Sequence, residues 1–484
     1  MPSLVARSLF RRLQRQDPVR PATRALRYAE PGLFGCKGSS IEFWKVEAQR
    51  AYHRSTGESG DQSARSGHGI DRLWRSGPIE QRSRCLARLW HWPASCTSRL
   101  IMIFVLIGIL LFYALPLVFA GWRLRRCPWL PSMPLPMGEV QPLPSVSVVV
   151  AARNEAAALP QAVQSLLDLD YPLLELIVVN DRSTDRSRAV LEELAARDPR
   201  LRIVTIEHLP PEWIGKSYAL HVGSGAAMGE FLLFADADVT LEKSALQHAL
   251  AFVRDRKLDH LTAIPDYVLV GFWERLMVGF FVLHVSLRFR VWAAGKRSSK
   301  ACAGIGAFNL VRASTYRAFG GHESLRFELI DDVMLGRRVK AVGGRSQIAW
   351  SGPLVRVRWQ VGLSGVLGGL KKNMFPSFGF NLGAALASVF GSLVAWGLPV
   401  VALAAGDSAV RITAALVMAL HAIAWNLLRL SDRRPWWIGL AMPAAGLLLA
   451  SALMQSVFVI WWRGGVVWRD TLYPLDALRR ARST

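Results

Sequence analysis

The sequence contains few cysteines and no arrangement of them that is typical of a metal site. Its five cysteines form no Cys-x-x-Cys pair and no Cys/His cluster with zinc spacing; they are Cys36, Cys85, Cys96, Cys127 and Cys302. We therefore expect neither a disulfide framework nor a structural zinc ion. Acidic residues are also few, because 36 Asp and Glu stand against 59 Lys and Arg, which gives a net charge of +23. An excess of this kind is typical of chains that meet nucleic acid or anionic lipid.

The first part of the chain lacks a long hydrophobic run. Residues 1–98 carry a net charge of +9, are rich in Arg, Ser, Gly and Gln, and show no sustained apolar period. They contain no hydrophobic stretch of the kind a secretory signal needs, and their eight acidic residues do not suit a transit peptide. One interpretation is a basic arm for nucleic acid or lipid; the favoured one is a disordered or miscalled extension, with Met102 opening the working chain. No recognition motif predicts a nucleic-acid partner.

The rest of the chain contains long apolar segments. Leu100–Ala120 carries no charge over 21 residues, which is enough for a helix to cross a bilayer. Arginines 123, 125 and 126 follow it, so the positive-inside rule predicts a transmembrane helix over 99–121 whose end lies in the cytoplasm. Three further candidates lie within 382–462, namely Leu382–Ala405, Ile412–Leu428 and Trp436–Trp461. The sequence thus predicts a multi-pass protein of a bacterial-type inner membrane with a cytoplasmic middle domain.

The last predicted helix leaves a conflict. The basic loop Arg429–Pro435 should be cytoplasmic, and a fourth crossing would then put the basic tail, 463–484, outside. Either one candidate is re-entrant or interfacial, or the tail breaks the rule. Phe272–Trp292 predicts an interfacial helix, with a buried core helix as the alternative. The segment 361–381 has the same two interpretations, and its Lys371 and Lys372 would face an anionic membrane surface. A Pro-rich linker is expected over 122–144.

The middle of the chain, 145–360, alternates apolar strand-like runs with helical ones, which predicts an α/β domain with a mostly parallel sheet. The expected strands are Ser145–Ala152, Leu174–Asn180, Leu201–Glu207 and Phe231–Val239. Polar residues follow three of them, and ligands bind beyond the carboxyl ends of strands in such sheets. These clusters are Ala152-Arg153-Asn154-Glu155, Asp181–Asp185, and the pair Asp236 and Asp238. We therefore expect one site that contains all three.

Two interpretations of these clusters remain open. Asp181–Asp185 contains residue types that cap helices, so it could simply begin the helix expected over Arg186–Ala196. Asp236 and Asp238 repel each other unless a cation is shared. Mg²⁺ or Mn²⁺ binds one or two carboxylates together with substrate phosphates. The second cluster alone is therefore ambiguous, whereas the third favours a site for a divalent metal and a diphosphate.

These segments resemble a known family. VVVAARNE, VVNDRSTD, WIGKSYAL and FADADV are similar to the nucleotide-sugar half of family 2 inverting glycosyltransferases, and Gly304–Leu325 and Glu328–Gly344 are similar to the acceptor half. The flanking helices and the ending Trp461–Leu475 resemble the hopene-associated glycosyltransferases, a membrane subgroup related to ceramide glucosyltransferases. This resemblance implies a GT-A type fold, with a mixed, mostly parallel sheet, and a UDP-sugar donor.

The resemblance also implies roles for individual residues. Asp181 would bind the uracil edge beside the 152–155 turn, and Lys216 would contact the nucleotide. Asp236 would lie near the ribose or the metal, and Asp238 would ligate the metal. Asp332 would be the general base of an acidic pair with Asp331, which stands where relatives usually have Glu; helix capping is the alternative for both. Residues expected on the acceptor side are Gly304, Gly306, Ala307, His322, Arg358 and Trp359.

The same family includes processive synthases with a (Gln/Arg)-x-x-Arg-Trp motif. Here Val355 stands three residues before Arg358, although Arg356 could substitute. The favoured hypothesis is therefore transfer of a single sugar to a membrane lipid acceptor, of hopanoid type by resemblance. The alternatives are a processive polysaccharide synthase and a noncatalytic membrane scaffold with a nucleotide-binding fold.

Overall fold

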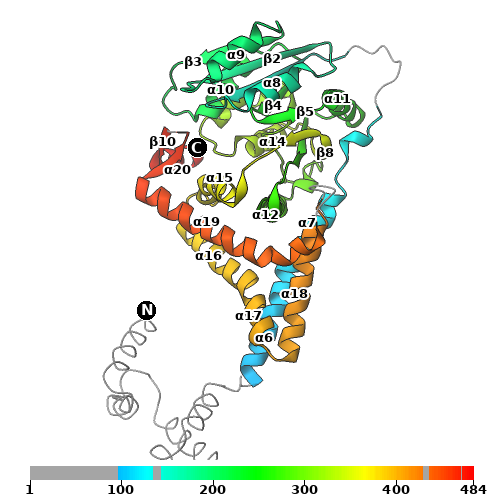
Figure 1. The fold of residues 1–484 in the computed structure, drawn as a ribbon, viewed down its shortest axis with the longest axis vertical. Helices are drawn as coiled ribbons and strands as arrows, with labels where there is room; N and C mark the ends of the chain where they lie inside the picture. Colours follow the sequence, from blue (N-terminus) through cyan, green and yellow to red (C-terminus); the bar gives the residue numbers. More distant parts are fainter. Residues whose placement is uncertain (1–95, 135–142, 429–434, 470, 484) are drawn as a thin grey trace, which may run out of the picture. The chain divides into compact units, whose positions relative to one another are not determined.

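The computed structural model describes residues 96–134, 143–428, 435–469 and 471–483, which belong to one compact unit. The interpretations of residues 1–95 and of the loop 429–434 lie outside the described residues. The α/β domain occupies the upper part of Figure 1, and the apolar helices α6, α7 and α16–α18 extend below it.

An eight-stranded mixed sheet organises the α/β domain, with the strand order β3-β2-β1-β4-β7-β6-β8-β5. The first four strands are parallel, β7 is antiparallel to both of its neighbours, β6 and β8 are parallel, and β5 pairs antiparallel with β8. The strands are β1 (Val146–Ala152), β2 (Leu174–Asp181), β3 (Leu201–Ile206), β4 (Phe231–Asp236), β5 (Val239–Leu241), β6 (His260–Tyr267), β7 (Asn309–Arg312) and β8 (Ser346–Val357).

Helices cover both faces of this sheet, because its strands are apolar on both sides. The helices of the domain are α8 (Leu159–Leu167), α9 (Ser187–Ala195), α10 (Gly215–Gly225), α11 (Ala245–Arg256), α13 (Ala313–Ala318) and α14 (Asp331–Ala341), with the short turns η3 (Val291–Ala293) and η4 (Gly321–Leu325). The expected mostly parallel α/β sheet is present. One detail was wrong: the strand expected over Phe231–Val239 ends at Asp236, because β5 leaves β4 to pair with β8 at the far edge of the sheet.

Four helices of the described residues are long and apolar enough to cross a membrane: Ser98–Arg125, Leu382–Ala405, Ser408–Asn426 and Trp436–Arg463. They contain α6 (Cys96–Ile109), η1 (Leu110–Ala114), α7 (Leu115–Arg125), α16 (Leu382–Ser392), η5 (Leu393–Gly397), α17 (Leu398–Ala405), α18 (Ser408–Asn426), η6 (Trp436–Ala441) and α19 (Met442–Arg463). Both π turns, η1 and η5, come just before a proline, Pro116 and Pro399, whose missing N–H interrupts the regular hydrogen bonding.

The helix α7 is attached directly to the α/β domain. The indole Nε1 of Trp350, in β8, donates to the carbonyl of Leu124 over 2.8 Å, and the Trp350 backbone N–H donates to Pro128. Trp129, just before η2 (Leu130–Ser132), forms a bridge with Trp350. The described start of the segment expected to be a linker therefore packs on the sheet, which fixes the first apolar helix relative to the domain.

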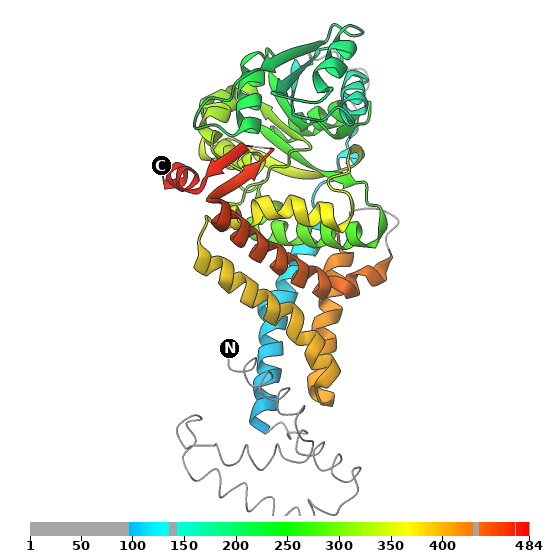
Figure 2. The same cartoon turned by 60° about the vertical axis from the view of Figure 1, so that its left-hand side comes forward.

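The helices α12 (Gly271–Phe289) and α15 (Gly362–Ser377) lie between the sheet and the apolar helices (Figure 2). Nine of the 19 residues of α12 are buried, and they pack against α7, α15, α18 and α19. This packing corresponds to the buried-helix alternative for 272–292.

The sequence did not decide how the last apolar helix, α19, runs relative to the other helices. Its N-terminal side, η6, packs on the end of α18, where the Asn426 amide donates to the Trp436 carbonyl. It then runs along α15 and α16 and ends beside a hairpin of β9 (Gly465–Trp468) and β10 (Thr471–Pro474), followed by α20 (Leu475–Ser483). The C-terminal end of α19 therefore lies beside the hairpin, and its N-terminal side lies beside α18 and α12, so that α19 runs obliquely to α18 in both views (Figures 1 and 2).

Candidate active site

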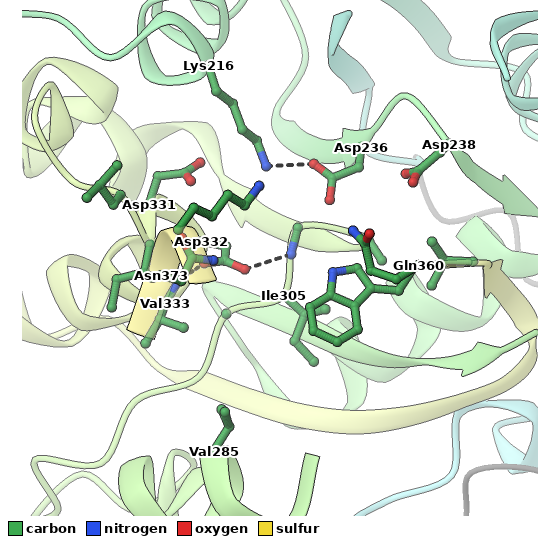
Figure 3. A pocket seen from close by; sticks show the side chains of 18 of the residues that line it. Lys216, Asp236, Asp238, Val285, Ile305, Asp331, Asp332, Val333, Gln360 and Asn373 are labelled. Atoms are coloured by element: carbon green, nitrogen blue, oxygen red, sulfur yellow. Dashed lines mark hydrogen bonds and ion pairs between the residues drawn. The ribbon is translucent and has the colours of Figure 1, made fainter. Parts of the chain in front are cut away.

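A cavity of about 380 Å³ lies at the carboxyl ends of β1, β2 and β4. Figure 3 shows Asp236 and Asp238 on one side of it and Asp331 and Asp332 on the other, with the Lys216 side chain extending between them. The three polar clusters expected at strand ends thus come together at this one edge of the sheet. At this edge, chain segments that are far apart in sequence supply charges of both signs.

The turn after β1 is held by the segment after β2. Asn154 adopts a φ of 56°, a left-handed conformation that Asn tolerates, and its side-chain oxygen accepts from the Thr184 backbone N–H over 2.8 Å. Ser183, Asp185 and Ser187 accept from the backbone N–H groups of residues 154, 156 and 155. Asn154 therefore shapes the turn and does not line the cavity, whereas Ala152, Arg153 and Glu155 do.

These contacts also answer the question of helix capping at Asp181–Asp185. The N-cap of α9 is Arg186, whose side chain makes no capping bond, while Asp185 accepts from the Ser187 N–H. Asp185 thus serves the helix start and the neighbouring turn. Asp181 instead lines the cavity and is buried there, with both carboxylate oxygens accepting from the Arg182 guanidinium. The sequence did not predict this pairing.

Lys216 and Asp236 form the central ion pair, with 2.6 Å between Nζ and Oδ1. Burial opposes the charge of Lys216, but the carboxylates of Asp236, Asp331 and Asp332 more than offset it and raise its pKa. Burial likewise disfavours a charged Asp236, yet Lys216 holds the pKa of that carboxyl below its usual value. Lys216 is therefore not simply a solvated surface lysine, because its ammonium is held among three carboxylates.

The negative charge of Asp238 is the one in this site that a bound cation would stabilise most. Asp238 is an exposed residue, yet desolvation of its carboxylate at the cavity, followed by the charges of Asp236 and Glu155, raises its pKa to about 6. A divalent ion would relieve that repulsion, and two carboxylates plus substrate phosphates form a donor set that suits Mg²⁺ or Mn²⁺. Within the described residues no three His, Cys, Asp or Glu side chains form a complete metal cage. The donor set therefore fits a metal that is shared with a bound phosphate.

Asp331 and Asp332 begin α14 without capping it, because the N-cap is Ile330. Asp332 is oriented by its own bonds, with Oδ2 accepting from the Gly306 N–H over 3.0 Å and Oδ1 accepting from the Val333 N–H. Burial, and then the adjacent Asp331 charge, raises the pKa of Asp332. A carboxylate with a raised pKa that faces a cavity has the properties required of a general base.

The glycines of the 304–306 segment have a steric role. A Cβ on Gly304 would lie 1.7 Å from the backbone oxygen of Asp332, and one on Gly306 would lie 2.5 Å from Asp236 Oδ2. Only glycine therefore lets this loop approach both acidic residues. Ala307 follows them in the cavity wall.

We expect Gly304→Ala to displace Asp332 and to cost roughly 1–3 kcal/mol of stability through overpacking. Turnover and the midpoint of thermal unfolding would measure the two effects. The matched control is Gly225→Ala at the end of α10, where nothing lies within 4 Å of the added methyl group. Equal behaviour of the two variants would contradict the close approach.

Two residues expected on the acceptor side lie elsewhere. His322 is buried behind the site, where its Nδ1 lies 2.8 Å from the Tyr316 hydroxyl and its ring packs edge-on against Phe234, and it does not line the main cavity. Arg358 forms an ion pair with Glu274 of α12 instead. Trp359 does line the cavity and stacks on Phe281. Arg358 thus has a structural contact, whereas Trp359 lines the site, because neighbouring side chains in an extended segment point in opposite directions.

Several lining residues were missed, most of them because they lie in the predicted interfacial segment 361–381 or in the basic tail 463–484. Gln360, Lys372, Trp468, Arg469 and Tyr473 line the cavity. The Tyr473 hydroxyl accepts from the Gly215 N–H over 3.0 Å, at the start of the helix that carries Lys216. The ending Trp461–Leu475, which was noted only as a resemblance, was the available signal.

The far part of the cavity is apolar. Its wall there comes from α12 and α15 and the turn between them and the sheet, with lining residues Phe281, Val282, Val285, Phe289, Val291, Leu370 and Met374. The same cavity therefore joins a charged end at the sheet to an apolar end at the helices next to the candidate membrane segments.

Comparisons with known proteins fit this arrangement. Residues 147–316 match the model of glycosyl transferase family 2. This part of the chain is a family 2 glycosyltransferase domain. Its fold is the GT-A type, with a mostly parallel mixed sheet and four candidate membrane helices outside the domain. The matched region ends before Asp331 and Asp332, so their roles rest on geometry.

Individual relatives are more distant. The chain is 29% identical over 197 residues to the 4,4'-diaponeurosporenoate glycosyltransferase of Staphylococcus haemolyticus, covering 40% of this chain and 51% of that protein. It is 34% identical over 139 residues to the beta-monoglucosyldiacylglycerol synthase of a Synechocystis species, covering 28% of each. It thus spans about half or less of these relatives. A mannosyltransferase from Pyrobaculum calidifontis, solved with GDP-Man and Mn²⁺, superposes with a TM-score of 0.49 at 18% identity, covering 73% of this chain and 99% of that one.

Proposed function

We propose that this chain is a membrane-bound inverting glycosyltransferase that transfers one sugar from a UDP-sugar to a lipid acceptor. The observation that carries the proposal is the single cavity with a charged end at the strand termini and an apolar end between α12 and α15. A nucleotide diphosphate suits the first end, and a lipid that enters from the bilayer suits the second. One relative is a beta-monoglucosyldiacylglycerol synthase, and diacylglycerol is a lipid. By resemblance we propose a hopanoid-type acceptor.

In this proposal Asp332 removes the proton from the acceptor hydroxyl as its oxygen attacks the anomeric carbon. The bond from that carbon to the diphosphate breaks on the opposite face, so the configuration inverts and the diphosphate leaves with the electron pair. The Gly306 N–H fixes the Asp332 carboxylate, and Lys216 remains in place beside Asp236. A divalent metal held by Asp238 and Asp236 would stabilise the negative charge on the departing diphosphate.

Membranes that contain the protein, incubated with radiolabelled UDP-sugars and then extracted, test the proposal. We expect label in a lipid product, lost when the metal is chelated and absent from membranes without the protein. Label in a growing polymer would favour the processive synthase. Neither transfer nor release of UDP from any donor would favour the noncatalytic scaffold.

We also propose that α19 lies along the cytoplasmic membrane surface and does not cross it, so that the tail and the α/β domain share the cytoplasmic side. α19 ends beside the β9–β10 hairpin, which contacts the α/β domain through the hydrogen bond between Tyr473 and Gly215, and this path removes the conflict between the basic tail and the positive-inside rule. Three crossings would then remain, made by α6–α7, α16–α17 and α18.

Single cysteines introduced into a cysteine-free background test this topology with an impermeant maleimide. Asp476→Cys in the tail and Asp255→Cys in the α/β domain should be labelled from the same side, and Ser408→Cys between α17 and α18 from the other; all three side chains are exposed. Labelling of Asp476→Cys together with Ser408→Cys would show that α19 crosses.

A further inference from the structure

A second set of cations reaches the cavity from outside the family 2 domain. Lys372 comes from α15 and Arg469 follows β9, far beyond residue 316 where the matched domain ends. Both side chains line the same cavity as Lys216 and Asp236. They therefore lie close to the Lys216–Asp236 pair.

Lys372 is a cation without an anionic partner. Among the residues that the structure describes, no carboxylate lies within ion-pair distance of it, and its ammonium rests 3.9 Å from the centre of the Trp468 ring. Burial, then the charges of Lys216 and Arg469, lower the pKa of Lys372 to about 8. A cation held beside other cations needs an anion to offset its desolvation.

The backbone of α15 is adjusted at this position. The Ser456 hydroxyl, from α19, donates to the Lys371 carbonyl over 2.5 Å and accepts from the Phe375 N–H over 3.1 Å. It thereby stands between two groups that a regular helix would bond directly, and Pro376 follows with no N–H to donate. The helix is therefore fixed by α19 just where Lys372 leaves it for the cavity.

Arg469 is held in a conformation that costs energy. Its φ of 44° lies in the left-handed region, which arginine adopts less readily than glycine or asparagine. Its guanidinium bonds the Arg153 carbonyl and the Glu155 carboxylate, in the turn after β1. The hairpin is thus fastened across the strand end, with Tyr473 on the Gly215 N–H as a second attachment.

From this geometry we propose that Lys372 and Arg469 bind the diphosphate of the donor nucleotide, so that α15 and the C-terminal hairpin complete a site which the family 2 domain alone leaves open. Trp468 positions Lys372 for this role. The inference rests on the proposed function, since it assumes a nucleotide-sugar donor. It assigns to the segments 361–381 and 463–484 a substrate-binding role in place of contact with anionic headgroups.

The test compares nucleoside diphosphates with nucleosides, using full-length protein in detergent. Calorimetry would give the affinities of wild type, Lys372→Met and Arg469→Gln for UDP, GDP, uridine and guanosine. We expect each variant to bind the preferred diphosphate about 10- to 100-fold more weakly, as for loss of one charge-assisted contact, while the affinity for the nucleoside stays unchanged. Lys372→Arg should recover part of the loss.

Lys371→Met and Arg463→Gln are the matched controls, because neither residue lines the cavity. Both should bind the diphosphate as wild type does. Diphosphate affinity that is unchanged in Lys372→Met and Arg469→Gln would overturn the inference and leave the proposed function intact. An equal loss of nucleoside and diphosphate affinity would also overturn it, since the cations would then act on the fold. Wild type that binds no nucleoside diphosphate would instead contradict the proposed function.

Discussion

Asp332→Asn is expected to lower turnover by about 10²- to 10⁴-fold, the range for loss of a positioned general base. The amide keeps the shape of the side chain and one oxygen for the Gly306 N–H, so the loop should remain in place. It cannot accept the proton of the acceptor hydroxyl. Donor affinity should therefore stay close to that of wild type, which separates chemistry from binding. Single-turnover transfer rates together with UDP affinity measure the two effects.

The matched control is Asp255→Asn at the end of α11, an exposed aspartate that does not line the cavity, which should leave turnover unchanged. Turnover of Asp332→Asn equal to that of wild type would remove Asp332 from the role of base. If Asp331→Asn alone abolished transfer, the base would be Asp331 instead.

The pH profile should follow the same group. Burial and the Asp331 charge raise the pKa of Asp332, so its basic form is lost at a pH above the usual aspartate value of about 4. Because the base must be deprotonated, we expect kcat/KM to fall as the pH decreases through this raised value. The two carboxyls titrate as a pair, so the profile reports the pair. An acidic limb close to pH 4 would argue against a buried base.

Asp238→Asn is expected to have the second large effect, about a 10²- to 10³-fold loss of kcat with a strong rise in the Mg²⁺ or Mn²⁺ concentration needed for half-maximal activity. The magnitude is that for losing one preorganised group that stabilises transition-state charge. The raised pKa of Asp238, caused by desolvation of its carboxylate and by the charges of Asp236 and Glu155, marks it as the carboxylate that gains most from a cation. Initial rates over a metal titration measure both quantities.

Binding of Mn²⁺ followed by electron paramagnetic resonance, with and without UDP, provides an independent readout. Wild type should bind Mn²⁺ more tightly when UDP is present, and Asp238→Asn should lose that enhancement. Asp198→Asn is the comparison, because Asp198 pairs with Arg200 on the surface and does not line the cavity. Metal dependence that is identical in Asp238→Asn and wild type would exclude Asp238 as a ligand.

Much of the fold followed from local pattern. The apolar runs at 146–152, 174–181 and 231–236 could only be buried strands, and the polar residues after them had to meet because parallel strands end at one edge. The split of the last run into β4 and β5 was not predictable, since it depends on pairing with β8, more than 100 residues later. Periodicity also could not distinguish an interfacial α12 from a buried one, because both are apolar helices.

Within the site, residue type and place at a strand end identified Asp181, Asp236 and Asp238, and the family resemblance added Lys216; all four line the cavity. The resemblance misplaced His322, because a family motif does not show whether a histidine faces the substrate or, as here, packs on Phe234. Asn154 and the Ser183–Asp185 stretch were seen as site residues or caps, whereas they hold two turns together. The spacing of residues within one segment does not reveal hydrogen bonds to a loop that is distant in sequence.

The sequence by itself determined an α/β domain between apolar helices, with acidic clusters at its strand ends, because burial and charge repulsion restrict where such residues can lie. Only the tertiary structure decided that α19 returns toward the domain and that Lys372, Trp468 and Arg469 enter the same cavity as Asp236. The segments that carry these residues have the composition of a basic membrane flank. Composition alone does not show whether their positive side chains face the membrane or the active site. The packing of α15 against α19 and the β9–β10 hairpin places these positive side chains beside the carboxylates of the site.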